Sequence, residues 1–375
     1  MKILFAGGGT GGHFYPIIAV AEKINEIADR EKILQVKLYY MSDSPYDKAA
    51  LFENGITYES LVAGKLRMYF SIQNFFDIFK TGFGTLIALV KLFFIYPDVV
   101  FAKGGYASFP TLVAARLLGI PVVIHESDSA PGRVNTFAGK FAQKIAVSFD
   151  EAGRFFPADR TAWTGQPIRK EIQNKAKEGA YEYLKLDPSV PVIWVVGGSQ
   201  GAQVINEAIM DALPTLLNSY QIIHQVGPKN IKELESEASV ILEKHPHKER
   251  YKAFAFLNPL AIKMCAGAST LIISRAGSML FEIANWGVPS IIIPITNTNG
   301  DHQRKNAYNY ARAGGCIVIE EANLTPHILV AEIENLLTNK EKMAHMSTSA
   351  LAYAHPDAAE KIARELINIG LSHEE

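Results

Sequence analysis

Residues 7–13 contain five glycines, a threonine and a histidine, in the order GGGTGGH. An apolar run at 2–7 precedes them and an amphipathic stretch from Pro16 to about Ala28 follows, which predicts a strand, a turn and a helix. Backbone N–H groups at a helix start, with no Cβ in the way, suit an anionic group such as phosphate. The loop could therefore hold a dinucleotide, a mononucleotide or a bare pyrophosphate, or serve only as a tight turn.

The dinucleotide alternative has its own support. Gly7, Gly9 and Gly12 match G-x-G-x-x-G, and Asp43 follows the apolar run at 36–41 at about the distance of a ribose-binding acid. This pattern would fit an NAD-dependent oxidoreductase. His13 adds another possibility, because a helix N-terminus favours the neutral imidazole that a general base needs. The same histidine could instead only cap or pack the helix.

A second glycine-rich turn lies at 197–202, with the sequence GGSQGA. It does not match the dinucleotide pattern, but it offers glycine amides, a serine hydroxyl and a helix start. A hydride-transfer enzyme needs one such cradle for phosphate. A transferase that joins two phosphorylated substrates needs two.

Short apolar runs that alternate with helical patterns must position both loops. They occur at 2–7, 36–41, 97–102, 111–119 and 121–126, and again at 191–196, 220–227, 269–277 and 289–295. This rhythm predicts an α/β fold with two doubly wound Rossmann-like domains and a cleft between them. We expect an N-terminal domain at 1–164, joined by a C-terminal helix at about 352–375, and a second domain at 165–351.

Composition excludes several classes of protein. The 375 residues carry a formal net charge of −1, so no global field attracts nucleic acid. The two cysteines, Cys265 and Cys316, have no metal-ligand spacing and fit a reducing, cytoplasmic compartment. We expect no signal peptide, no stretch near the ~20 apolar residues that span a bilayer, and no metal, since Asp-x-Asp does not occur.

Nine motifs occur in order along the chain. They are GGGTGGH (7–13), GGYAS (104–108), HES (125–127), GQPIR (165–169), GGSQGA (197–202), HQVG (224–227), SRAGS (274–278), FEIA (281–284) and DHQRKNA (301–307). The series resembles the peptidoglycan N-acetylglucosaminyltransferases. These enzymes transfer N-acetylglucosamine from UDP-N-acetylglucosamine to undecaprenyl-pyrophosphoryl-N-acetylmuramyl-pentapeptide. The resemblance implies the GT-B architecture, an inverting transfer and a β-1,4 linkage.

The resemblance assigns the donor to the C-terminal domain. Arg169 would pair with the donor pyrophosphate, and Ser199 and Gln200 would bind the donor phosphates at the second helix start. Arg169 and the loop dipoles could also stabilise the UDP leaving group without a metal.

The nucleoside and the sugar would contact four further residues. Glu282 would accept hydrogen bonds from the ribose, and Leu257 would present backbone groups to uracil. Gln303 and Asn306 would contact the sugar hydroxyls. SRAGSMLFE has one residue fewer before Glu282 than is usual in this family.

The acceptor would bind in the N-terminal domain. Thr10, Gly11 and Gly12 would cradle its pyrophosphate rather than NAD, and Tyr106 and Asn135 would line the pocket. His13 and Glu126 are the candidate catalytic bases, with His13 favoured. Asp128 stands where the family usually has asparagine, and a charge there would either repel a pyrophosphate or alter contacts to the acceptor.

The segment at 66–97 is unusually apolar and aromatic, with basic residues at Lys65, Arg67, Lys80 and Lys91. It would bind the cytoplasmic face of the inner membrane without spanning it, as a lipid-linked acceptor requires. A pair of buried helices is the alternative. Two other functions also stay open: a GT-B enzyme for another glycolipid or soluble acceptor, and a silent nucleotide-sugar-binding module.

Overall fold

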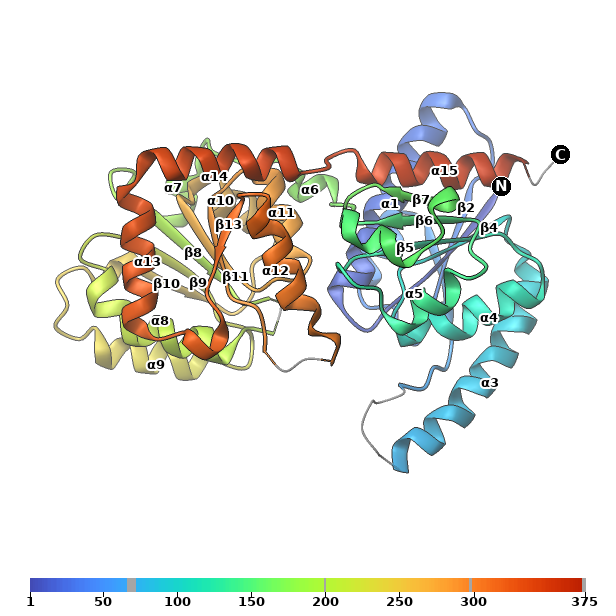
Figure 1. Ribbon diagram of the computed structural model, residues 1–375, viewed down its shortest axis with the longest axis horizontal. Coiled ribbons are helices and arrows are strands. Elements are labelled where there is room, and N and C mark those ends of the chain that lie inside the picture. The colour runs from blue at the N-terminus through green and yellow to red at the C-terminus, as the bar shows by residue number, and fades with distance from the viewer. Residues whose placement is uncertain (66–71, 199, 297–298, 373–375) are drawn as a thin grey trace. The chain divides into compact units, whose positions relative to one another are not determined.

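The computed structural model of the chain describes residues 1–65, 72–198, 200–296 and 299–372 (Figure 1). The chain divides into two compact units, each with one parallel sheet. Unit 1 comprises Met1–Lys170 and His355–Glu375, and unit 2 comprises Glu171–Ala354. The divisions therefore fall after Lys170 and before His355, where the sequence suggested 164 and 352.

Unit 1 is built on a seven-stranded sheet in the order β3-β2-β1-β4-β5-β6-β7. Every neighbouring pair is parallel, as the alternation of apolar runs and helical patterns predicted. The strands are β1 (Lys2–Ala6), β2 (Lys37–Ser42), β3 (Ile56–Ser60), β4 (Val99–Ala102), β5 (Val122–Glu126), β6 (Lys144–Val147) and β7 (Thr161–Trp163).

Helices cover both faces of this sheet. They are α1 (Gly11–Glu31), α2 (Lys48–Glu53), α3 (Ile72–Ile95), α4 (Phe109–Leu117), α5 (Arg133–Ala138) and α15 (Ala358–Ser372), with 3-10 helices η1 (Tyr106–Ser108), η2 (Asp150–Phe155) and η3 (Ala158–Arg160). The run at 111–119 is thus helical. Helix α1 begins at Gly11, before the predicted Pro16, because the N–H groups of His13 and Phe14 both donate to the Thr10 carbonyl at 3.1 Å.

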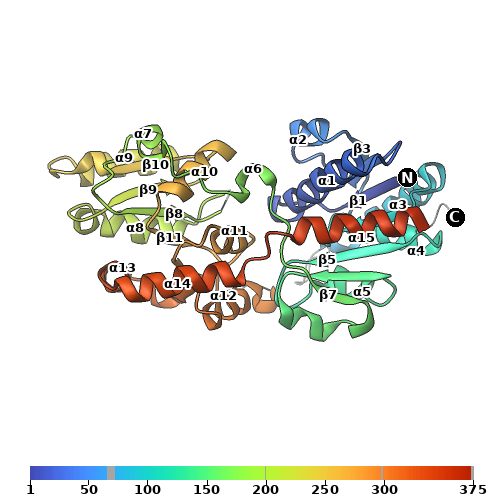
Figure 2. The same cartoon turned by 90° about the horizontal axis from the view of Figure 1, so that it is seen from above.

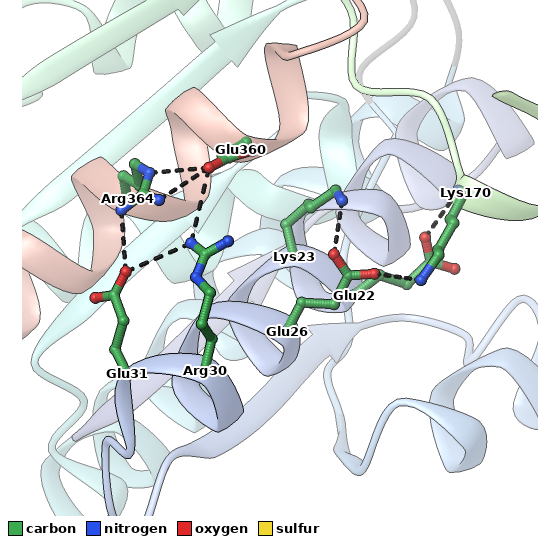
Figure 3. A network of polar contacts seen from close by, with 8 residues as sticks. All are labelled: Glu22, Lys23, Glu26, Arg30, Glu31, Lys170, Glu360 and Arg364. Atoms are coloured by element: carbon green, nitrogen blue, oxygen red, sulfur yellow. Dashed lines mark hydrogen bonds and ion pairs between the residues drawn. The ribbon is translucent and has the colours of Figure 1, made fainter.

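Helix α1 contacts both segments of unit 1 that connect to unit 2, namely the residues around Lys170 and helix α15 (Figures 2 and 3). The α15 face with Ile362 and Leu366 shares one buried core with α1. Arg364 reaches Glu31 at 3.2 Å, and the Lys170 ammonium reaches Glu26 at 2.7 Å. Exposed ion pairs of this kind are worth about 0–1 kcal/mol each, so apolar burial fixes α15 and the charges set its position.

Unit 2 has a six-stranded parallel sheet in the order β10-β9-β8-β11-β12-β13. Its strands are β8 (Val192–Val196), β9 (Gln221–Gln225), β10 (Tyr251–Phe254), β11 (Leu271–Ser274), β12 (Ser290–Ile292) and β13 (Cys316–Val318). Its helices are α6 (Lys170–Gln173), α7 (Ala180–Leu184), α8 (Gln203–Leu216), α9 (Ile231–Ile241), α10 (Pro259–Ala268), α11 (Met279–Trp286), α12 (His302–Arg312), α13 (Pro326–Thr338) and α14 (Lys340–Tyr353), with 3-10 helices η4 (Lys248–Arg250), η5 (Asn299–Asp301) and η6 (Glu321–Asn323).

The strand orders locate the loops that can bind ligands. In a doubly wound sheet the ligand lies at the carboxyl ends of the strands, where the strand order reverses. In unit 1 that point lies between β1 and β4, and in unit 2 between β8 and β11. The loops at 7–10 and 103–105 therefore meet in unit 1, and those at 197–202 and 275–278 meet in unit 2.

Helix α3 departs from two expectations. Its part Phe75–Ile95 is, by length and composition, apolar enough to cross a membrane. The prediction that no apolar stretch is long enough to span a bilayer was therefore wrong. A pair of buried helices is also wrong for the described residues: α3 is one helix that packs by one face on α4. That face contains Asp77, Ala88 and Leu92, which are buried. A helix held in this way is part of the unit 1 fold.

The opposite face of α3 is apolar and exposed. Six side chains at helical spacing are each more than half exposed: Phe75, Phe79, Phe83, Leu86, Val90 and Phe93. Large exposed apolar patches of this kind mark contact with a membrane or another protein. The preceding residues 66–71 of the predicted membrane segment lie outside the described residues.

Candidate active site

The first glycine loop is too tightly packed for side chains. Gly8 and Gly9 have φ values of +145° and +85°, which L-residues with side chains rarely adopt. A Cβ on Gly8 would lie 2.2 Å from the Ser42 hydroxyl oxygen, and one on Gly11 would lie 2.9 Å from the Tyr46 hydroxyl oxygen. Thr10 is exposed, and Gly11 and Gly12 begin α1 half-exposed. The helix start is thus available to an anion.

His13 stands at this helix start with one ring nitrogen engaged. Its Nδ1 lies 2.8 Å from the Thr10 hydroxyl. Its Nε2 side faces Gly105, where a Cβ would lie 3.6 Å away. Burial and the positive charge of Lys103 lower the pKa of His13 to about 4, against the opposing negative charge of Asp128. The imidazole is therefore neutral near pH 7, the form that accepts a proton.

Lys103 was missed by sequence analysis, and it lies beneath the loop. It follows β4, and its backbone N–H donates to the Ala6 carbonyl at 3.0 Å. The residue is 1% exposed. Its ammonium lies 2.5 Å from His125 Nδ1 and 2.5 Å from the Ser127 hydroxyl. Burial lowers the pKa of Lys103 to about 7, against the opposing charges of nearby carboxylates.

A buried polar network surrounds the Lys103 ammonium. His125 Nε2 donates to the Gly165 carbonyl at 2.9 Å, so its Nδ1 is an acceptor. Gln166 Oε1 accepts from Ser148 at 2.8 Å and from Ser127 at 3.1 Å. Gln166 lies within the GQPIR motif, but its role was not predicted. The network ties the ends of β4, β5 and β6 together.

Glu126 organises the loop after β5. Its carboxylate accepts hydrogen bonds from the Asp128 N–H at 2.9 Å, the Gly132 N–H at 3.1 Å and the Asn135 amide at 2.8 Å. Burial and the charge of Asp128 raise the pKa of Glu126, and the three donors oppose them. Asn135 is buried and also donates to the His125 carbonyl at 3.1 Å. These contacts hold both side chains in place, and the roles of Glu126 as a base and of Asn135 in the acceptor pocket stay predictions.

Tyr106 and Asp43 bind each other. The Tyr106 hydroxyl donates to the Asp43 carboxylate at 2.6 Å, which helps to raise the pKa of Tyr106 to about 12. The Ser42 hydroxyl donates to the same carboxylate at 3.2 Å. The Asp43 carboxylate, which would bind the ribose of a dinucleotide, is therefore already hydrogen-bonded to Tyr106 and Ser42.

Arg169 belongs to unit 1, although the sequence assigned it to the donor domain. Its guanidinium lies 3.8 Å from the centroid of the Tyr15 ring on α1. Its positive charge also acts on Tyr46, whose hydroxyl contacts Gly11. Arg169 is thus close to the first helix start, and its pairing with a donor pyrophosphate stays a prediction.

The second glycine loop packs glycine against backbone in unit 2. Gly201 has a φ of +78°, and a Cβ there would lie 2.0 Å from the Val226 carbonyl oxygen. A Cβ on Gly227 would lie 2.2 Å from the carbonyl oxygen of Gln200. Ser199 lies outside the described residues. The loop ends at the start of α8, which has the geometry of an anion site.

The remaining donor residues follow three different strands of unit 2: Leu257 follows β10, Glu282 follows β11, and Gln303 and Asn306 follow β12. Glu282 lies half-buried in the first turn of α11, and Leu257 is buried just before α10. Asn306 is buried and donates to the Ala276 carbonyl at 3.1 Å. Gln303 Oε1 accepts the Ile295 N–H at 3.2 Å. The last two residues hold the loops at this end of the sheet, and their contact with sugar stays a prediction.

Arg275 is a second residue that sequence analysis missed. It is 8% exposed and donates to the Ile293 carbonyl at 3.1 Å and to Glu321 at 3.0 Å. Glu321 in turn accepts the Thr296 N–H at 3.0 Å. This buried pair fixes the loop after β12. Within the described ranges, no cluster of three or more His, Cys, Asp or Glu side chains could hold a metal.

Comparison with known families decides the class. Residues 3–147 match the glycosyltransferase family 28 N-terminal domain, and residues 192–362 match the glycosyltransferase family 28 C-terminal domain. The chain belongs to glycosyltransferase family 28. As a family 28 glycosyltransferase it has the expected two Rossmann-like domains of the GT-B type, and the oxidoreductase alternative is wrong.

Individual family 28 relatives cover almost the whole chain. A Bacillus cereus protein is 35% identical over 343 residues, which are 91% of this chain and 92% of the relative. A Halothermothrix orenii protein is 34% identical over 365 residues, 95% of each chain. Both are named UDP-N-acetylglucosamine–N-acetylmuramyl-(pentapeptide) pyrophosphoryl-undecaprenol N-acetylglucosamine transferase, the former with the suffix 2.

The fold also matches a solved structure. The crystal structure of Acinetobacter baumannii MurG superposes with a TM-score of 0.73 over 98% of this chain and 99% of that chain. The two sequences are 24% identical, so this likeness supports the fold.

Proposed function

We propose that the protein transfers N-acetylglucosamine from UDP-N-acetylglucosamine to undecaprenyl-pyrophosphoryl-N-acetylmuramyl-pentapeptide and forms a β-1,4 linkage. The observation that carries this proposal is the pair of glycine-loop helix starts, one in each unit, in a chain with full-length relatives of that name. The first loop binds the acceptor pyrophosphate, and the second binds UDP.

The reaction needs a base and a stabilised leaving group. The acceptor hydroxyl oxygen attacks the anomeric carbon of N-acetylglucosamine, its proton passes to His13 Nε2, and the bond from that carbon to the UDP oxygen breaks. Attack opposite the leaving group inverts the α-linked donor to a β-linked product. For this role His13 carries its own proton on Nδ1, donated to Thr10, which leaves the Nε2 lone pair free.

The UDP leaving group gains negative charge as the bond breaks. Amides at the start of α8, oriented by the helix dipole, stabilise it. Glu282 binds the ribose hydroxyls from the first turn of α11. Arg169 contributes positive charge next to the glycine loop of unit 1.

The protein meets its lipid-linked acceptor as a peripheral protein on the cytoplasmic side of the membrane. The exposed face of α3 enters the membrane interface, while the face with Ala88 and Leu92 stays packed on unit 1. Lys80, which is exposed beside the apolar face, interacts with anionic headgroups. The helix lies in the interface and does not cross the bilayer.

The α3 proposal predicts the effect of a triple variant. Changing Phe79, Phe83 and Phe93 to serine should weaken binding to phosphatidylglycerol-containing vesicles at least tenfold in a sedimentation assay. These rings are 60–64% exposed, so the fold should be unaffected. The matched control changes Leu34, Phe52 and Phe155, which are 60–86% exposed on other elements of unit 1, to serine. Equal vesicle binding by both triple variants would contradict the proposal.

The donor half is tested by calorimetric titration with UDP-N-acetylglucosamine, with NAD and TDP-glucose as controls. The wild type should bind only the uridine ligand, and Glu282→Ala should raise its Kd about tenfold, because the ribose loses a charged hydrogen-bond acceptor. Binding of NAD instead, or equal affinity in Glu282→Ala, would contradict the assignment.

A further inference from the structure

A buried lysine is the most unusual charge in unit 1. Lys103 is 1% exposed, and its three nearest acceptors are His125 Nδ1, the Ser127 hydroxyl and, at 3.4 Å, Gln166 Oε1. All three acceptors are uncharged. His125 donates the proton on Nε2 to the Gly165 carbonyl and accepts at Nδ1, and the other two acceptors are a hydroxyl and an amide oxygen. A charge in such a place is expensive unless other charges compensate it.

Two carboxylates, one at the end of β5 and one in the loop after it, supply that compensation. The charges of Glu126 and Asp128 both act on Lys103, and the charge of Asp128 also acts on Glu126 and His13. The group thus contains one ammonium and two carboxylates. Without the ammonium, two negative charges would remain beside the glycine loop.

The group lies directly against the proposed pyrophosphate site. A Cβ on Gly7 would be 3.5 Å from both the Lys103 Cβ and the His13 carbonyl oxygen, so both residues pack against this glycine. Gly105, two residues after Lys103, borders the His13 ring. Any anion held by the first loop is therefore exposed to the net field of this group.

We propose that Lys103 is a positioning residue that balances the charges of Glu126 and Asp128, so that the acceptor pyrophosphate can bind at the first glycine loop. This inference rests on the proposed function, since it takes the acceptor to be a pyrophosphate diester. Lys103 does not touch the acceptor. It acts by lowering the negative field of the two carboxylates and by holding Ser127 in place.

Charge balance predicts a rescue that a purely structural role does not. Lys103→Met should raise the KM for a short-chain polyprenyl-pyrophosphoryl-N-acetylmuramyl-pentapeptide at least tenfold near pH 6, where Lys103 carries its charge, with the KM for UDP-N-acetylglucosamine unchanged. Lys103→Met/Asp128→Asn removes one charge of each sign and should restore the acceptor KM to within about threefold of wild type. Lys144→Met, which removes a half-exposed lysine of unit 1, is the control and should match wild type.

The pH dependence gives a second readout. Around Lys103, burial lowers the pKa values of the histidines His13 and His125, so both are neutral near pH 7, and Tyr106 titrates only near 12. Glu126 and Asp128 supply the negative charges. Lys103, with a pKa of about 7, loses its proton as the pH rises from about 6 to about 8, so wild-type kcat/KM for the acceptor should fall over that range.

In the double variant this alkaline limb should be absent. The proposal is overturned if Lys103→Met leaves the acceptor KM unchanged, or if the double variant remains as impaired as the single one. Calorimetric binding of the same acceptor analogue separates the two proposals. If the wild type binds the analogue but transfers no sugar, the proposed function fails, and the order of affinities among the variants still tests the charge balance. Thermal unfolding of each variant confirms that it is folded.

Discussion

His13→Gln should lower kcat by about 10²- to 10⁴-fold, the usual contribution of a positioned general base. Glutamine keeps a polar group near Thr10 but cannot accept the proton of the attacking hydroxyl. The KM for UDP-N-acetylglucosamine should stay within about twofold, because His13 belongs to unit 1. Transfer measured with both substrates saturating gives kcat directly, and the exposed His327, changed to glutamine, serves as the control.

The pH profile separates His13 from Glu126 as the base. Burial and Lys103 lower the pKa of His13 to about 4, so wild-type kcat/KM should remain level down to about pH 5 and fall below that. Glu126→Gln should mainly lower Tm, because an amide NH₂ would face N–H donors at Asp128 or Gly132. A His13→Gln enzyme with more than a tenth of wild-type kcat would rule out His13 as the base.

Gly201→Ala should abolish tight binding of UDP-N-acetylglucosamine. The new Cβ would lie 2.0 Å from the Val226 carbonyl oxygen and would adopt a φ of +78°. Backbone cannot yield as a flexible side chain does, so the loop at 197–202 must move away from β9. We expect the free energy of unfolding to fall by about 2–3 kcal/mol and the Kd for UDP-N-acetylglucosamine to rise at least tenfold.

Gly179→Ala is the matched control in the same unit. Gly179 has a φ of +70°, but no atom lies within 4 Å of its Cβ position. It should lose about 1 kcal/mol from backbone strain alone and bind UDP-N-acetylglucosamine normally. Chemical denaturation and calorimetry compare the two variants. Similar losses of stability and affinity in both would show that the clash at Gly201 is unimportant.

The sheets were predictable because their strands are nearly continuous apolar runs. Segments such as 121–126 and 191–196 are buried on both faces, and this burial leaves a strong sequence pattern. The start of α1 was less predictable, since glycines favour helices weakly and only the Thr10 carbonyl contacts fix the first turn at Gly11. For α3, an apolar composition on all sides could not tell a buried helix from one with an exposed face.

The site was predicted in part, and the residues whose roles were not predicted were missed for the same reason. His13 and the glycine loops lie where motifs placed them, whereas Lys103 and Gln166 are buried polar groups whose partners come from distant strands. A lysine that ends an apolar strand at the carboxyl edge of a parallel sheet was the available signal. Arg169 was placed in the donor domain because Gly165 and Pro167 broke the pattern, but unit 1 continues to Lys170.

Transfer of labelled N-acetylglucosamine from UDP-N-acetylglucosamine to undecaprenyl-pyrophosphoryl-N-acetylmuramyl-pentapeptide in vesicles tests the central claim most directly. The product should carry the new sugar in a β linkage, read from its anomeric proton coupling by NMR, and His13→Gln should yield almost none in the same time. An α-linked product, or no transfer by a wild-type protein that is folded and binds UDP-N-acetylglucosamine, would contradict the account.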